Sequence, residues 1–415
     1  MWRRLRSFDR SVQLLMLNQL TINIGFYMLM PYLAGHLSGG LGMAAWTVGL
    51  VLGVRNLSQQ GLFLLGGTLA DRLGYKPVIV AGCLLRTAGF ALLGLVDSLP
   101  ALLVASAATG FAGALFNPAV RAYLAHDAAD RRVEAFALFN VFYQAGILVG
   151  PLIGLALVAV DFRLACLTAA AVFAALTVLQ IRALPQCRAG DAAGGGVFAD
   201  WRTVLSGRSF LLFSLAMAGS YVLSFQLYLA LPLQLDGAGA VSVLFVLSAV
   251  VAIAGQLRVT ERARRRWSHP QAMTRGLLLM AAAFLPLALT GTAWPHATVP
   301  RVGAVLLCAV LLTLATTLIY PFEMDTVVSL AGGRLVATHY GLYNTVAGIG
   351  IALGNLLTGL LLDGGATALP WLVLSALGAV CALAVHRLGR RGRLTPEEGE
   401  REPASPAPPG NHSRA

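Results

Sequence analysis

Long apolar runs, each long enough to cross a lipid bilayer as a helix, recur along the whole chain. A bilayer core takes about 20 helical residues to cross. Only 12% of the 415 residues are charged and 57% are hydrophobic, whereas a soluble domain carries about 25% charged residues. We therefore predict an all-α integral membrane protein with twelve transmembrane helices, over 11–35, 45–69, 77–97, 101–122, 134–160, 164–184, 207–233, 239–259, 271–291, 302–328, 337–361 and 370–387.

Basic residues lie almost entirely in alternate segments between these runs. Arginine and lysine cluster before the first run and in every second loop, while the other loops hold little beyond Arg163 and Arg301. Short loops rich in arginine and lysine remain in the cytoplasm, so we predict a multi-pass protein with both termini cytoplasmic. This placement explains the net charge of +12 without nucleic acid as a partner.

The twelve predicted helices divide into two sets of six. A glycine-rich polar stretch, 186–206, is expected to be a cytoplasmic linker between an N-terminal bundle, 1–185, and a C-terminal bundle, 207–388. The tail 389–415 is rich in Pro, Glu and Ser. Such a composition cannot bury a core, and we expect this segment to be disordered.

The two halves share a short internal repeat. "FALFN" at 136–140 opens the fifth predicted helix, and "YGLYN" at 340–344 opens the eleventh. The same offset matches two glycines of one helix with two of the other, namely Gly146 with Gly350 and Gly150 with Gly354. Parallel repeats related by an axis along the membrane normal occur in secondary transporters, which bind substrate where the repeats meet.

The loop after the second predicted helix, "GGTLADRLGYKP", concentrates charges and glycines between two apolar runs. It resembles the loop 2–3 signature of the major facilitator superfamily, G-x-x-x-D-R-x-G-R-[RK]. The matching residues are Gly67, Asp71, Arg72, Gly74 and Lys76, while Tyr75 stands where a basic residue is usual. The surrounding run "GVRNLSQQG…GGTLADRLGYKPVIVAGCLLRTAGFA" is similar to MdtH-type drug-efflux proteins, which also lack that base. The resemblance implies two pseudo-symmetric six-helix bundles that alternate between inward-open and outward-open states.

This loop is expected to act as a gate on the cytoplasmic face. Asp71 is well placed to cap the N-terminus of the eleventh helix, near 337–341, which would stabilise the outward-open state. In related proteins the acid that ends helix four joins this network, and here that acid is Asp127, with Arg121 nearby. Because Tyr75 stands at the position of the usual base, the role of that base is expected to shift to Arg72 or Lys76. The alternative is an ordinary polar turn.

A second signature lies in the fifth predicted helix. "GILVGPLIGL" at 146–155 resembles the motif G-x-x-x-G-P-x-x-G-G associated with antiporters, and its matching residues are Gly146, Gly150, Pro151 and Gly154. Small residues at this spacing let two helices approach closely, so a plain helix contact is the alternative. The arginine that antiporters often carry in helix four, in R-x-x-x-G, is absent, because Ser106 precedes Gly110 at that spacing.

Four ionisable residues stand out within the predicted helices, where each needs a partner or a function. Glu323 and Asp325 lie in the tenth helix, and either is a candidate carrier of a coupling proton, because a carboxyl group in an apolar environment readily holds its proton. They point about 200° apart, so at most one faces the cavity. We favour Glu323; the alternative is an interfacial acid that caps a helix or pairs with Arg334.

The two basic residues within helices are Arg55, with Gln59 one helical turn later, and Arg86. Arg55 is expected either to face the substrate cavity, where it would bind an anionic group, or to form a structural ion pair. A structural ion pair is the favoured interpretation of Arg86, in a peripheral helix. Aromatic and amide side chains among apolar neighbours add candidates for a loose substrate cavity, namely Asn18, Asn23 and Tyr27 on the first helix and Tyr221, Gln226 and Tyr228 on the seventh. Helix packing is the alternative for each.

The sequence thus indicates a secondary transporter, and not an enzyme, that exports hydrophobic drug-like small molecules in exchange for protons. No cofactor, catalytic residue or metal site is expected, and the resemblance implies a monomer in a bacterial cell (inner) membrane. Uptake, or export of one specific and anionic metabolite, is the alternative within transport. A non-transporting receptor or scaffold that kept the fold is the alternative from another class.

Overall fold

The computed structural model describes residues 2–187, 196–235, 238–293, 298–363 and 367–394. These residues are almost entirely helical, with no strand among them. Residues 395–415 of the predicted disordered tail and 188–195 of the predicted linker lie outside the described residues. The first two residues of the predicted tail, 389 and 390, are instead helical.

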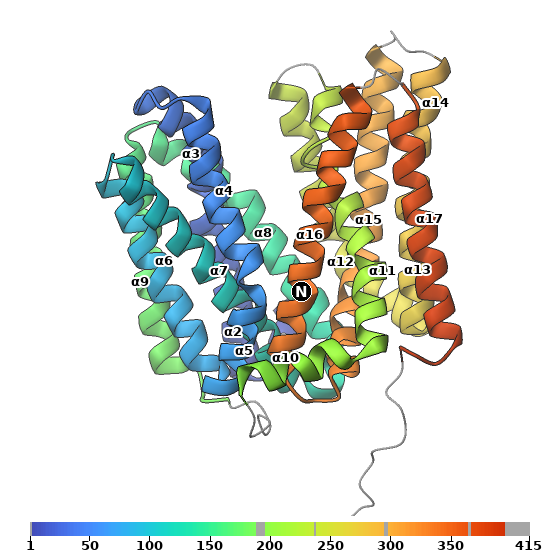
Figure 1. Ribbon diagram of the computed structural model, residues 1–415, viewed down its shortest axis with the longest axis horizontal. Helices are drawn as coiled ribbons and strands as arrows, with labels where there is room; N and C mark the ends of the chain where they lie inside the picture. The colour runs from blue at the N-terminus through green and yellow to red at the C-terminus, as the bar shows by residue number, and fades with distance from the viewer. Residues whose placement is uncertain (1, 188–195, 236–237, 294–297, 364–366, 395–415) are drawn as a thin grey trace, which may run out of the picture.

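The N-terminal bundle contains the helices drawn from blue to green in Figure 1. They are α1 (Trp2–Leu5), α2 (Arg10–Tyr27), α3 (Met30–Gly35) with a π-helical turn (His36–Gly40), α4 (Ala45–Gly61), α5 (Phe63–Leu73), α6 (Tyr75–Leu95), α7 (Leu99–Asp127), α8 (Arg132–Val158) and α9 (Phe162–Ala183). The amphipathic helix α10 (Val197–Ser206) then leads to the second bundle.

The C-terminal bundle contains the helices drawn from green to red. They are α11 (Arg208–Phe225), α12 (Ala238–Arg266), α13 (His269–Ala283), α14 (Leu285–Ala293), α15 (Thr298–Ala331), α16 (Val336–Asp363) and α17 (Leu369–Arg390), with a short 3-10 turn (Pro232–Gln234) after α11. The run predicted as one helix over 207–233 therefore ends at Phe225 and continues as turns.

Eleven helical segments among the described residues are long and apolar enough to cross a membrane. The twelfth span is the α4–α5 pair, predicted as one helix over 45–69 but broken at Leu62, next to Gly61. After this break, α5 packs on both α7 and α16. Large apolar side chains such as Val104, Leu152 and Val380 are more than 60% exposed, as expected of a surface in contact with lipid.

The two bundles come together at the end of the molecule where α10 lies, and their helices diverge toward the other end (Figure 1). We call the α10 side the linker end. The main contacts between the bundles are α5 with α16 and α8 with α12, which are equivalent pairs if the two halves are repeats.

Glycines set the packing of equivalent helix pairs within the bundles. A Cβ at Gly146 would lie 2.5 Å from the Cβ of Asn23, where α8 meets α2. A Cβ at Gly354 would lie 2.3 Å from Cγ1 of Val222, where α16 meets α11. The repeated glycines of the sequence therefore serve the same helix contact in each bundle.

Glycines also allow α5 and α16 to cross at close range between the bundles. A Cβ at Gly67 would lie 2.1 Å from the main-chain oxygen of Ala337, and one at Gly341 would lie 2.4 Å from that of Phe63. Neither contact involves a flexible side chain that can move aside. The crossing therefore requires glycine on both helices.

Replacing Gly67 by alanine tests this close approach. We expect Gly67→Ala to lower the free energy of unfolding by about 1–3 kcal/mol, the usual effect of overpacking, measured by thermal unfolding of the purified protein. Gly359→Ala on α16 is the matched control, because nothing lies within 4 Å of a Cβ there. Equal stability of the two variants would contradict the close approach.

Candidate functional site

The carboxylate of Asp71, at the end of α5, caps the N-terminus of α16 in the other bundle. Oδ1 accepts a hydrogen bond from the N–H of Ala337 at 3.1 Å, and Oδ2 accepts from the N–H and Oγ1 of Thr338 at 2.7 and 2.6 Å. The first N–H groups of a helix have no acceptor in their own helix and form its positive end. Asp71 is only 3% exposed, so this contact is a buried link between the bundles.

The neighbours of Asp71 differ from those expected. The hydroxyl of Tyr75 donates to Oδ1 of Asp71 at 3.5 Å, so a phenol lies near Asp71 at the position where the signature has a base. Lys76 instead donates from Nζ to the main-chain oxygen of Ile181, at 2.8 Å, near the end of α9. Gly74 has φ 91°, a conformation that favours glycine and lets α6 begin directly after α5.

Helix α10 binds to α5 through two side-chain hydrogen bonds. Nε of Arg72 donates to Oδ2 of Asp200 at 2.7 Å, and Nε1 of Trp201 donates to Oγ1 of Thr68 at 2.9 Å. Asp200 is fully buried. The segment 186–206 was predicted to be a polar linker, and α10 was not predicted within it. The glycines before α10 dominate the composition of this segment and hide the helical pattern.

Asp127 and Arg121, which were expected to join the Asp71 network, have other partners in the structure. Oδ1 of Asp127 lies 3.1 Å from Nδ1 of His126, and Cys187, at the start of the linker, completes a group of ligand-type atoms within 4.8 Å of one another. Arg121 lies between the bundles, where Nη1 donates to Oδ1 of Asn344 at 3.3 Å and the side chain also hydrogen-bonds Tyr320.

Glu323, on α15, is buried within a cluster of phenols. The hydroxyl of Tyr343, on α16, donates to Oε1 of Glu323, and Tyr221, on α11, also hydrogen-bonds the carboxyl. The rings of Tyr221 and Tyr343 meet edge to face, with centroids 6.0 Å apart. Arg121 of the other bundle interacts electrostatically with Glu323. The cluster therefore contains one acid, two phenols and one cation from the facing bundle.

Asp325, two residues later, has different partners. Oδ1 lies 2.6 Å from Nε of Arg132, on α8, and Oδ2 lies 2.9 Å from Nε2 of His269, on α13. These are charge contacts whose angles fall outside those of a good hydrogen bond. The sequence suggested pairing with Arg334 only as one alternative; in the structure the charged partners of Asp325 are Arg132 of the other bundle and His269 of its own bundle.

Arg55 and Arg86 share a phenylalanine ring in the N-terminal bundle. The ring centroid of Phe26 lies 4.6 Å from Cζ of Arg55 and 5.5 Å from Cζ of Arg86. Arg55 donates to the amide oxygens of Asn56 and Gln59, at 2.6 and 3.0 Å. The ion pair expected for Arg86 is not found among the described residues, where its guanidinium contacts aromatic rings instead.

Among the predicted cavity residues of the first helix, only Tyr27 lies beside Arg55, with which it interacts electrostatically. Asn18 faces α9 in a small space shared with Gln180, and Asn23 donates to the main-chain oxygen of Tyr143 at 3.0 Å. Both asparagines therefore take part in packing within the N-terminal bundle, the alternative considered for them.

The three cavity candidates predicted on the seventh helix also lie in different surroundings. Tyr221 joins the Glu323 cluster, whereas Gln226 is fully buried and donates to Oδ1 of Asn355 at 3.3 Å within its own bundle. Tyr228 lies beyond the end of α11, is 52% exposed and stacks on Phe245 with ring centroids 5.6 Å apart.

The antiporter-like motif of α8 packs against α2. A Cβ at Gly150 would lie 2.9 Å from the Cβ of Tyr27, and one at Gly154 would lie 2.0 Å from the main-chain oxygen of Met28. The hydroxyl of Tyr32 donates to the main-chain oxygen of Pro151 at 2.6 Å. This motif thus forms a tight helix contact inside one bundle.

Sequence reasoning missed the tyrosines of α16, although the repeat contained a signal for them. Tyr340 and Tyr343 occupy the places of Phe136 and Phe139 in the other half. The two added hydroxyls are both used: Tyr340 donates to the main-chain oxygen of Met324 at 2.8 Å, and Tyr343 donates to Glu323. A departure from the repeat in which phenylalanine becomes tyrosine therefore marks the polar cluster.

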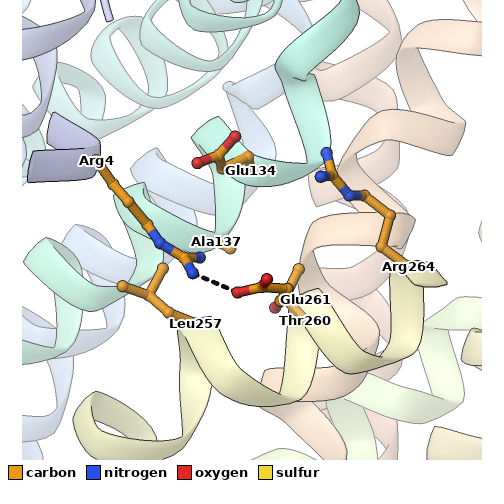
Figure 2. A pocket seen from close by; sticks show the side chains of 7 residues that line it. All are labelled: Arg4, Glu134, Ala137, Leu257, Thr260, Glu261 and Arg264. Carbon is orange, nitrogen blue, oxygen red and sulfur yellow. Dashed lines mark hydrogen bonds and ion pairs between the residues drawn. The ribbon is translucent and has the colours of Figure 1, made fainter. Parts of the chain in front are cut away.

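A pocket of about 220 Å³ lies at the linker end between α1, α8 and α12. Figure 2 shows Arg4 reaching across it to form an ion pair with Glu261 of the other bundle. Glu134 and Arg264 line the same space. Because its lining contains none of Arg55, Arg86, Arg121, Glu323 and Asp325, we assign this pocket to the contact between the bundles and not to substrate.

A further interbundle contact is a buried pair of amides. Nδ2 of Asn140, on α8, donates to Oε1 of Gln256, on α12, at 2.6 Å, and Nε2 of Gln256 donates to the main-chain oxygen of Thr317 at 2.8 Å. Buried polar groups are costly when unpaired, so this arrangement favours the state in which the bundles are joined here.

The Arg132–Asp325 contact can be tested by a double-mutant cycle. We expect Arg132→Gln and Asp325→Asn each to lower thermal stability, and the double variant to lose less than the sum, with a coupling free energy of about 0.5–3 kcal/mol. Arg132→Gln combined with Glu323→Gln is the control and should be additive. Additive effects in the Arg132–Asp325 cycle would show that the pair contributes nothing.

The comparisons with known proteins agree with this architecture. Residues 15–354 match the family model for the Major Facilitator Superfamily. An uncharacterized MFS-type transporter of Mycobacterium tuberculosis is 51% identical over 92% of this chain and 94% of its own length. The multidrug resistance protein MdtH of Salmonella newport is 30% identical over 92% of this chain and 96% of its own length.

A solved structure shows the same fold at low sequence identity. The crystal structure of the human organic anion transporter MFSD10 superposes with a TM-score of 0.71 and 18% identity, covering 91% of this chain and 99% of that one. With its two six-helix bundles and its match over most of the sequence, the chain is a multi-pass membrane protein that belongs to the major facilitator superfamily.

Proposed function

We propose that the protein exports hydrophobic, drug-like small molecules in exchange for protons, by alternating access. The single observation that carries this proposal is Glu323, a buried carboxyl between phenols that faces a cation of the other bundle. The 30% identity to MdtH supports efflux. The arginine-rich segments at the linker end support an orientation in which this end and both termini face the cytoplasm of a bacterial cell.

In this proposal the structure represents the outward-open state. The Asp71 cap, the Arg132–Asp325 pair and the Asn140–Gln256 pair all join the bundles at the linker end. Helix α10 reinforces the first of these through Asp200. Breaking these contacts together lets the bundles rock about the central helices, which closes the opposite end and opens the cytoplasmic one.

Proton binding at Glu323 supplies the coupling. While ionised, the carboxylate attracts Arg121 of the other bundle and favours the closed linker end. A proton that enters from outside neutralises Glu323 and removes this attraction, so the cytoplasmic side opens and the proton leaves there. The hydroxyls of Tyr221 and Tyr343 orient the carboxyl in both protonation states, because a phenol can donate or accept.

Glu323→Gln tests the coupling step. In everted vesicles, addition of hydrophobic dyes to energised membranes should release protons from the wild-type vesicles, as reported by a fluorescent pH probe. We expect Glu323→Gln to abolish this signal, because the amide cannot carry a proton. Asp325→Asn should retain it, at reduced stability, since Asp325 serves the interbundle pair. Dye-driven proton movement in Glu323→Gln would refute the assignment.

Asp71→Asn tests the cap. An asparagine keeps one acceptor oxygen but turns an NH₂ group toward the N–H donors of α16. Because hydrogen bonds to a charged group contribute about 1.5–3 kcal/mol each, turnover should fall tenfold or more while substrate affinity changes little. Asp130→Asn, at an exposed position of the same end, is the control for charge. Undiminished transport by Asp71→Asn would rule out a gating role.

A second candidate function is transport of one specific anionic metabolite, in either direction. The observation that favours it is the pair Arg55 and Arg86, for which the described residues supply no carboxylate partner.

A further inference from the structure

We infer that the N-terminal bundle carries a binding site for an anionic group, built on Arg55 with Arg86 behind it, and that the exported compounds are hydrophobic organic anions. This inference rests on the proposed export function and names its substrate class. It follows from the contacts of the two arginines, their surroundings and the balance of charge within the helices.

Arg86 is a buried cation for which the described part of the chain supplies no counter-ion. Its side chain is 5% exposed, and its Cζ lies 5.5, 5.9 and 5.4 Å from the ring centroids of Phe26, Phe116 and Phe173. Its Nε has no acceptor. Cation–π contacts contribute about 0.5–2 kcal/mol each, whereas an unpaired charge within a membrane is far more costly. The field of Arg86 therefore favours an anion nearby.

Arg55 is the member of the pair that a ligand can reach. It is partly exposed. Within the described ranges its hydrogen bonds go to the neutral amide oxygens of Asn56 and Gln59, and its Nε has no acceptor there. Gln59 lies near both arginines: it accepts from Arg55, and its Nε2 and Nη2 of Arg86 would each lie 3.1 Å from a Cβ at Gly113. The charges of Arg55 and Arg86 repel each other, which a bound anion relieves.

Aromatic groups from both bundles lie around Tyr27, the neighbour of Arg55. Tyr27 interacts with Arg55, and Tyr143 and Tyr228 interact with Tyr27. Tyr228 belongs to the second bundle and is 52% exposed. The site therefore lies where the bundles face each other, with rings for an apolar body and a guanidinium for its charge. Guanidinium binds a carboxylate through two parallel hydrogen bonds.

The balance of charge deep within the helices is positive. Among the described residues three arginines lie there, Arg55, Arg86 and Arg121, against Glu323, because Asp325 is engaged by Arg132 and His269. A region with this balance repels a cationic drug and attracts an anion. Export of an anion in exchange for a proton is also favoured by a membrane potential that is negative inside, since both movements carry charge in the favourable direction.

Binding of a matched pair of probes, 2-naphthoate and the neutral 2-naphthamide, tests the site. With purified full-length protein, measured by ligand-induced quenching of tryptophan fluorescence, we expect naphthoate to bind at least tenfold more tightly than naphthamide. Arg55→Gln should remove this preference while changing naphthamide affinity by less than about threefold, and Arg55→Lys should restore it in part. Equal binding of both probes by the wild type, or an equal loss of both in Arg55→Gln, overturns the inference.

Three further measurements separate this inference from the proposed function and from a simple ion site. Glu323→Gln should keep the preference for naphthoate although proton coupling is lost. Arg55-dependent naphthoate binding in a protein that shows no proton-coupled transport would leave the anion site standing and refute the export mechanism. If chloride abolishes naphthoate binding, when compared with gluconate, and no naphthoate efflux from proteoliposomes is seen, the site holds an inorganic ion and the substrate class assigned here is wrong.

Discussion

Two N–H groups at the start of α16 have no acceptor in their own helix, and the carboxylate of Asp71 from the other bundle accepts both. The packing of the two bundles at the linker end is built around this contact. Gly67 and Gly341 bring α5 and α16 close enough for it, and the break at Leu62 gives α5 the direction it needs. Because the capping group and the capped helix belong to different bundles, the contact exists only when the bundles are joined.

Polar groups deeper in the molecule also face each other across the boundary between the two bundles. Glu323 and Arg121 face each other from different bundles, so a change in the charge of Glu323 alters the attraction between the bundles directly. Asp325 is held by Arg132 at the linker end. Two acids only two residues apart on one helix therefore have separate partners: Glu323 contacts phenols and interacts with Arg121, whereas Asp325 contacts Arg132 and His269.

The sequence was sufficient for the fold and for the Asp71 contact, but not for most of the polar partners. Twelve apolar runs and alternating basic loops define the spans, and the signature around Asp71 includes its position relative to the eleventh helix.

Asn18 and Asn23 were placed in the cavity because helices that are apolar on every face give no periodicity that distinguishes one face from another. The partner of Asp325 was missed because Arg132 is distant in sequence and belongs to the other bundle. The change from Phe139 to Tyr343 between the repeats could have revealed the Glu323 cluster.

Distances between the bundles at both ends of the molecule test the central claim most directly. One pair of spin labels can be placed at the exposed positions Leu73 and Arg334 at the linker end, and another at Val160 and Val299 at the opposite end. The distance distribution of each pair would then be measured by pulsed electron–electron double resonance, with the protein in nanodiscs, at low and at neutral pH. Alternating access predicts that the linker-end distance increases on acidification while the opposite distance decreases, and that Glu323→Gln removes this response to pH. Distances that stay fixed, or that change at one end only, would contradict the account.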